Sequence, residues 1–235
     1  MCNQKKTAAF EYFVSKLVGL DLEKEKRKRR LRLIDLGKKK TLSKENDLNE
    51  KLSEYCMTRY MKLLYFLCLT DANQEEKGKE GVVPDDNLLK TFDKFEAYLN
   101  GPVEVDIYEN RLYEGIFTLF TFEEGRLRLR KERLARKAQK ILKETSPEVR
   151  KAIDGALSDL RDKGSKIVPN KSILEQDTIS LVELSHSLNS DVWPACFYYN
   201  KQGGSISQLF REDSSLLGAE VLEFENQLIK NSIEK

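Results

Sequence analysis

The single histidine of the chain, His186, is the first residue to test for catalytic chemistry. A nucleophilic triad requires a histidine that is oriented by a carboxylate and faces a nucleophile. Ser185 is the sequence neighbour of His186 and points elsewhere on a helix, whereas Glu183 lies one helical turn earlier, within reach of the imidazole. A metal site requires two or three further ligands, and no cysteine or second histidine is in register with His186. We therefore expect His186 to be a hydrogen-bonded core residue near a helix end, packed beside Trp193.

Carboxylates are numerous in the centre of the chain, but no two of them stand out as an acid–base couple. Glu96 is the best candidate for a shifted pKa, because it is flanked by Phe95 and Ala97. The alternative is that Glu96 lies on a helix surface and bonds a neighbouring lysine or tyrosine. The sequence also contains no glycine-rich phosphate loop. We therefore expect that the protein is not an enzyme and that it holds no metal or other cofactor.

Two basic segments stand out in a chain whose net charge is only +2. Residues 24–40 carry ten Lys/Arg against two acids and residues 126–143 carry nine against one, so the other 200 residues sum to −14. An acidic body with two basic segments favours charge-guided docking. The candidate nucleic-acid contacts in these segments are Lys26, Arg27, Lys28, Arg29, Arg30, Arg32, Arg126, Arg130, Arg133, Lys137 and Lys140.

Three interpretations of the basic segments remain open. The segments contact the phosphates of a nucleic acid, they contact an acidic surface of this chain or of a partner protein, or they form solvated helix faces. The run at 24–32 lacks the interleaved aromatic residues that stack on bases. Neither segment therefore supports sequence-specific readout.

Hydrophobic periodicity predicts a mainly helical fold. Residues 60–69 are apolar nearly all round and should form the central buried helix. The sequence Asn100-Gly101-Pro102 predicts a helix stop, because glycine adopts the left-handed conformation readily and proline cannot continue the hydrogen-bond ladder. The expected helices cover residues 8–22, 41–70, 88–99, 103–113, 126–143, 146–163, 173–188 and 216–230, with an exposed loop at 73–86 and a segment at 196–209 that is compatible with a small β-hairpin.

The cysteines and the apolar runs indicate a cytoplasmic location. Cys2, Cys56, Cys68 and Cys196 show no C-x-x-C spacing, which favours a reduced, intracellular setting. The first six residues are polar and lack the apolar run of a signal peptide. The longest apolar stretch covers residues 63–69, about a third of the length that a membrane span requires.

Three short segments, taken together in order, resemble the Panacea domain, the SocA-like family of phage-associated antitoxins. They are RYMKLLYF at 59–66, FEAYLNGPVEVDIY at 95–108, and 181–193, where a histidine near a helix end precedes a tryptophan. Tyr98 stands where the family commonly has tryptophan, and Glu104-Val105 replaces an apolar residue followed by proline. The residues that carry the resemblance are Lys62, Leu64, Tyr65, Phe66, Phe95, Ala97, Tyr98, Gly101, Pro102, Val103, Tyr108, His186 and Trp193.

The resemblance implies a compact helical Panacea-type domain over residues 49–235, preceded by a basic helical extension over residues 1–48. It also implies a non-enzymatic antitoxin that binds and blocks a cognate toxin, usually encoded by an adjacent gene. The residues of the resemblance should hold the shared scaffold, while loops and appended arms choose the partner. Around the glycine–proline turn, the candidate partner contacts are Tyr98, Glu104, Tyr108 and Arg111.

Other functions compete with direct toxin neutralisation. A nucleic-acid-binding regulator would use the two basic segments to contact phosphates. A protease adaptor would deliver the toxin for degradation instead of blocking it. A hydrolase that uses His186 ranks last.

Overall fold

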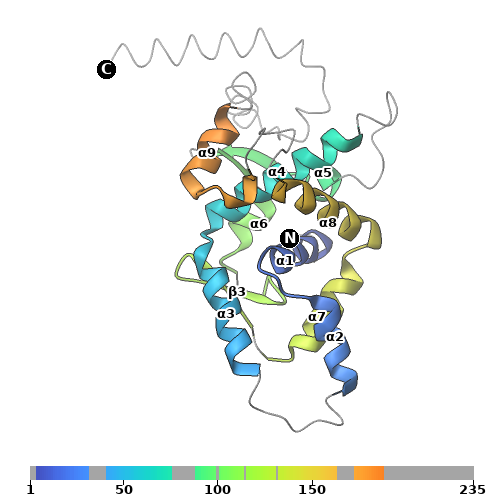
Figure 1. The fold of residues 1–235 in the computed structure, drawn as a ribbon. Coiled ribbons are helices and arrows are strands. Elements are labelled where there is room, and N and C mark those ends of the chain that lie inside the picture. The colour runs from blue at the N-terminus through green and yellow to red at the C-terminus, as the bar shows by residue number, and fades with distance from the viewer. Residues whose placement is uncertain are drawn as a thin grey trace, which may run out of the picture.

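A computed structural model describes the chain over residues 4–31, 41–75, 88–98, 101–113, 115–130, 132–162 and 172–187. The expected segment at 196–209, the expected helix at 216–230, Arg32 and Trp193 lie outside the described residues. The predicted mainly helical fold is confirmed (Figure 1). Its elements are α1 (Gln4–Leu17), α2 (Leu22–Leu31), α3 (Thr41–Glu54), α4 (Met57–Glu75), α5 (Leu88–Thr91), β1 (Phe95–Tyr98), β2 (Gly101–Glu104), α6 (Val105–Asn110), β3 (Phe120–Glu123), β4 (Arg126–Leu129), α7 (Leu134–Glu144), α8 (Pro147–Arg161), the 3₁₀ turn η1 (Ile173–Glu175) and α9 (Thr178–Ser187).

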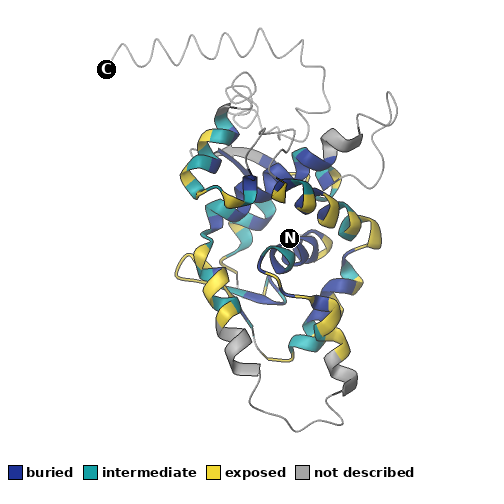
Figure 2. Cartoon of the chain, viewed as in Figure 1, coloured by how far each residue is buried: buried dark blue, intermediate teal, exposed yellow. Residues whose placement is uncertain are grey.

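Helix α1 lies inside the molecule and is buried on every side over residues 6–15 (Figure 2). It packs against α5, α7 and α8. The Phe10 ring lies 6.4 Å from the Tyr60 ring of α4 and 5.7 Å from the Phe117 ring before β3. This part of the segment predicted as an extension over residues 1–48 therefore belongs to the same hydrophobic core as the rest of the described chain.

Helix α4 is the second buried helix, as the apolar run at 60–69 predicts. Residues 60–68 are all buried. The single helix expected over 41–70 is wrong, because the chain breaks between α3 and α4 at Tyr55 and Cys56. Cys56 forms an isolated antiparallel bridge with Arg126, so its backbone pairs with β4 in place of continuing the helix.

Residues 95–98 and 126–129, which the sequence predicts to lie in helices, form strands β1 and β4. Phe95–Tyr98 pairs antiparallel with Gly101–Glu104, and Phe120–Glu123 pairs antiparallel with Arg126–Leu129. In β4 burial alternates with a period of two, which is the pattern of a half-buried strand. Gly101 therefore stands at the start of a strand in a hairpin, where the sequence predicted a helix stop.

The helix expected over 146–163 is confirmed at its start and falls two residues short at its end. Ser146 is the N-cap of α8, its Oγ accepts a hydrogen bond from the Val149 N–H at 3.2 Å, and Pro147 follows at the first helical position. The helix expected over 103–113 is shorter than predicted and corresponds to α6. The helix expected over 173–188 is divided into the 3₁₀ turn η1 and the helix α9. None of the helices among the described residues is long and apolar enough to cross a membrane.

Candidate functional site

The three segments that carry the family resemblance meet at Gly101. The Lys62 ammonium of α4 donates a hydrogen bond of 2.8 Å to the carbonyl of Pro102. Gly101 has a φ of +95°, and a Cβ atom placed there would lie 2.5 Å from Lys62 Nζ and 2.7 Å from Ser185 Oγ of α9. Only glycine leaves room for both side chains in this backbone conformation. We call Lys62, Gly101, Pro102 and Ser185 the Gly101 junction.

A lysine beside a serine hydroxyl raises the question of nucleophilic chemistry. Lys62 and Ser185 are both 0% exposed, and burial lowers the pKa of Lys62 to about 7. The Ser185 hydroxyl, however, donates to the Val182 carbonyl at 2.7 Å, and neither side chain is open to solvent. His186 is half-buried, and burial followed by the charge of Lys62 lowers its pKa. This geometry fits a packed joint between α4, β2 and α9, and the absence of enzymatic activity stays a prediction.

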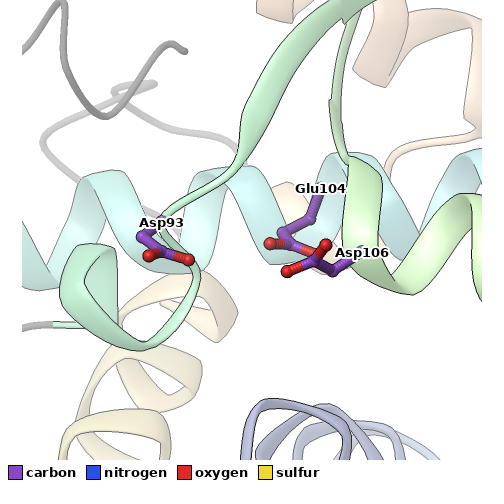
Figure 3. Close-up of side chains that lie close together, drawn as sticks. All are labelled: Asp93, Glu104 and Asp106. Atoms are coloured by element: carbon purple, nitrogen blue, oxygen red, sulfur yellow. The ribbon is translucent and has the colours of Figure 1, made fainter. Parts of the chain in front are cut away.

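A second cluster, buried at Glu104 and open at Asp93, joins α1 to the first hairpin, and Figure 3 shows its three carboxylates. Asp93 follows α5, Glu104 ends β2 and Asp106 lies in α6, and their carboxylates come close enough together to hold a cation. The Lys6 ammonium lies there, at 2.6 Å from Asp93, 2.6 Å from Glu104 and 2.8 Å from Asp106. The arrangement is therefore an internal ion-pair network in which lysine supplies the positive charge.

The charges of this network shift the pKa values of its members. Burial opposes the charged form of Lys6, but Glu104, Asp106 and Asp93 together raise the pKa of Lys6 above its usual range. Burial raises the pKa of Glu104 in spite of Lys6. For Asp106 burial is outweighed by the hydrogen bonds from Lys6 and Lys94, which lower its pKa. Sequence analysis missed Lys6, since its partners lie about a hundred residues away along the chain.

Sequence analysis also missed Glu11, a fully buried carboxylate on α1. Its two oxygens accept hydrogen bonds from the backbone N–H groups of Thr118, Leu119 and Phe120. Burial raises the pKa of Glu11 to about 7, against the effect of these three donors. Glu11 thus ties α1 to the start of β3. The one available signal is an acid within the apolar run AAFEYFV, where a charge needs partners.

The predicted partner contacts around the hairpin lie in different environments. Glu104 is 0% exposed, accepts from the Ile107 N–H at 2.9 Å and pairs with Lys6, so its carboxylate is used internally. Tyr98 is paired with Gly101 across the hairpin. Tyr108 is half-buried, and the Arg111 guanidinium lies 3.8 Å from the centre of its ring.

Arg111 also lines a hollow of about 570 Å³ in the described part of the chain, which we call the α6–β3 groove. It runs between the segment after α6, the β3–β4 hairpin and the start of α7. The segment 116–122, IFTLFTF, supplies much of its floor, and sequence analysis did not single it out. The lining residues are Arg111, Leu112, Tyr113, Ile116, Phe117, Phe120, Thr121, Phe122, Glu123, Leu129, Arg130, Glu132 and Lys137.

The two basic segments, far apart in the sequence, come together. Helices α2 and α7 pack side by side (Figure 1). Lys26 and Arg27 of α2 are exposed. The single helical stripe predicted over 126–143 is wrong, because Arg126 lies on β4 and Arg130 between β4 and α7, while Arg133, Lys137 and Lys140 follow at the cap and along α7. Lys28, Arg29 and Arg30 are positions of α2.

The described residues define a mainly helical protein with a glycine-centred buried junction, an internal ion-pair network and one groove. Comparison of the chain with protein-family models, with curated proteins and with solved structures found no match.

Proposed function

We propose that the chain is an antitoxin that neutralises a cognate toxin by binding it directly. The observation that supports this proposal is the Gly101 junction. Three segments separated by up to about 120 residues resemble one family in their order, and their residues Lys62, Gly101 and Ser185 form a single buried contact. This contact places the three segments at one point of the fold, as expected of residues that hold a shared scaffold.

The burial of these residues supports a scaffold role for them, with the partner bound elsewhere. Lys62, Leu64 and Phe66 are each 0% exposed. Large exposed apolar side chains occur instead after α6, where Leu112 is 70% and Tyr113 is 68% exposed. Exposed aromatic and aliphatic side chains of this kind are common anchors of protein interfaces.

Co-expression with the product of the adjacent gene tests the proposal. We expect the chain to restore growth of cells that express a toxic neighbour and to co-purify with it. The double variant Leu112→Ser and Tyr113→Ser should weaken binding about tenfold or more. Ile179→Ser is the matched control, because Ile179 is similarly exposed, at 72%, but belongs to α9 and does not line the groove that contains Leu112. Failure of both growth rescue and co-purification by the unaltered chain would reject the proposal.

A protease adaptor predicts a different result in the same cells. Blocking by occupancy leaves the toxin intact and bound, whereas delivery to a protease shortens its lifetime. The toxin's half-life in protease-deficient cells therefore separates the two: rescue that survives loss of the protease supports direct neutralisation.

The packing of α2 against α7 favours nucleic-acid binding as a second candidate function. It joins two segments that are each rich in Lys and Arg into one region of the molecule. Phosphate binding would make the affinity fall as the salt concentration rises. Replacing one phosphate-binding cation by a neutral residue would reduce the slope of this dependence by about one.

The test of this second function is a salt titration with a duplex DNA and a matching RNA. We expect two double variants to reduce the dependence of the affinity on salt concentration: Lys26→Gln with Arg27→Gln, and Arg133→Gln with Lys140→Gln. The control Lys90→Gln on α5 should leave this dependence unchanged. Substitution is preferable to removal of residues 1–45, because that truncation also removes the buried helix α1. Binding that is absent or independent of salt would dismiss this function.

A further inference from the structure

The α6–β3 groove combines an apolar floor with exposed apolar rims. Phe117 and Phe120 are almost fully buried at its base, and Phe122 and Ile116 are half-buried beside them. At the rim Leu112 and Tyr113 are largely exposed. A hollow of about 570 Å³ is within the usual size range of binding sites, roughly 300–1,000 Å³.

The groove also carries cations that the described residues leave without a carboxylate partner. Arg111, Arg130 and Lys137 line it, and none of them forms an ion pair within the part of the chain that the structure describes. Arg130 Nε donates to the Phe120 carbonyl at 2.9 Å, and Lys137 Nζ donates to the Arg130 carbonyl at 3.3 Å. These backbone acceptors hold the side chains in place without neutralising them.

The acids of the groove do not compensate this charge fully. Glu123 lies 3.6 Å from Arg128, which is outside the groove lining. Glu132 is the other lining acid, and it is exposed. Burial, followed by the charge of Arg130, lowers the pKa of Lys137, and Glu132 and Glu11 oppose this shift.

We propose that the α6–β3 groove binds a peptide segment of a partner protein in which acidic side chains adjoin aromatic or aliphatic ones. Carboxylates of that segment pair with Arg111, Arg130 and Lys137, while its apolar side chains lie against the accessible apolar residues of the lining, Leu112, Tyr113, Ile116 and Phe122. This inference deepens the proposed function and rests on it for the identity of the partner as a toxin. The groove chemistry itself is testable without any toxin.

A peptide fits this groove better than a nucleic acid does. The lining contains more apolar than cationic side chains, whereas affinity for a nucleic acid comes mainly from cations that neutralise phosphates. The cations are few and lie next to phenylalanine rings; the Arg111 guanidinium is 5.3 Å from the Phe122 ring centre. Such a mixture of apolar anchors and a few cations matches short acidic–apolar motifs.

Selection from a random 12-residue peptide library against the full-length protein tests the inference. We expect the enriched peptides to place Asp or Glu next to Phe, Leu, Ile, Trp or Tyr. Fluorescence titration of one enriched peptide should show about tenfold weaker binding to Arg111→Gln with Lys137→Gln, and weaker binding at high salt. Lys137→Gln alone is the second variant, because it spares the packing of Arg111 on Tyr108.

The matched control is Arg136→Gln with Lys143→Gln, which removes two exposed charges from α7, the helix that carries Lys137, and neither residue lines the groove. This control should bind the peptide as the unaltered chain does. The inference is overturned if no peptide is enriched, if enrichment is independent of acidic residues, or if the groove variants bind normally. Displacement of the peptide by oligo-dT, or a concentration-dependent dimer that the groove variants abolish, would likewise overturn it in favour of another occupant.

The proposed function and the groove proposal fail in different ways. If the adjacent gene product is harmless or does not co-purify, the proposed function falls while the peptide result stands. If the toxin binds equally to Arg111→Gln with Lys137→Gln, the proposed function stands and the groove is not its binding surface.

Discussion

Gly101 should tolerate substitution poorly. A methyl group there would collide with Lys62 Nζ and Ser185 Oγ, and the φ of +95° strains any other L-residue. We expect Gly101→Ala to lower the free energy of unfolding by about 2–4 kcal/mol, measured by urea denaturation. Gly125→Ala is the control, since Gly125 has a similar φ of +78° with nothing within 4 Å. An equal loss in the free energy of unfolding for the two variants would contradict the close packing of the Gly101 junction.

Lys62 should make stability depend on pH above neutrality. Its pKa is about 7 in the folded chain and near 10.5 in the unfolded chain, so the unfolded chain binds more protons between these values. The free energy of unfolding should therefore rise as pH increases from about 7 to about 10.5. Lys62→Met should remove this rise. The measurement is a series of urea titrations over this pH range, and parallel pH profiles for the two proteins would refute the assignment.

At the scale of elements, the Lys6 network should hold α1 against the first hairpin. Lys6→Met leaves Glu104 buried and Asp106 half-buried without their cation, and we expect a loss of about 2–4 kcal/mol in the free energy of unfolding. Lys16→Met removes an ion pair with Asp154 at the surface of the same helix and should cost less than about 1 kcal/mol. Thermal melts compare the stability of the two variants. A Lys6→Met protein as stable as Lys16→Met would show that the network does not stabilise the fold.

The elements that the sequence predicts well are those with local signals. Helix α8 has Ser146 and Pro147 at its start, and α4 has a continuous apolar run. The sequence of strand β4 is ambiguous because Leu127 also fits the helical spacing of α7, whereas the alternation over 126–129 reflects its pairing with β3. Residues 95–98 likewise form strand β1 through their pairing with β2.

The candidate sites also differ in whether a local sequence signal indicates them. Lys62 and Gly101 lie in conspicuous local motifs, so sequence analysis singled them out, although their mutual contact spans about forty residues. Lys6 and Glu11 make their bonds across 87–100 and 107–109 residues, so no local pattern indicates their partners. The α6–β3 groove is assembled from the segment after α6, a hairpin and a helix start, so only the folded chain displays it.

At the scale of the whole molecule, the described residues share one hydrophobic core that includes α1. We therefore expect α1 and α4 to open together, in a global transition. Hydrogen exchange measured by mass spectrometry should give peptides from residues 8–15 and 60–68 the same free energy of opening, and urea should unfold both in a single coincident step. Faster exchange over residues 8–15 than over 60–68 would mean that α1 opens as a separate arm.

The central place of α1 has a consequence for the newborn chain. Tyr12 bonds Asp154 at 3.0 Å across 142 residues, and Lys16 donates to the same carboxylate. At roughly 5–20 residues per second, a ribosome needs on the order of ten seconds to deliver α8 after α1 has emerged. Throughout that interval Phe10, Phe13 and Val14 lack part of the native surface that covers them, so chaperones at the ribosome should bind α1 until α8 emerges.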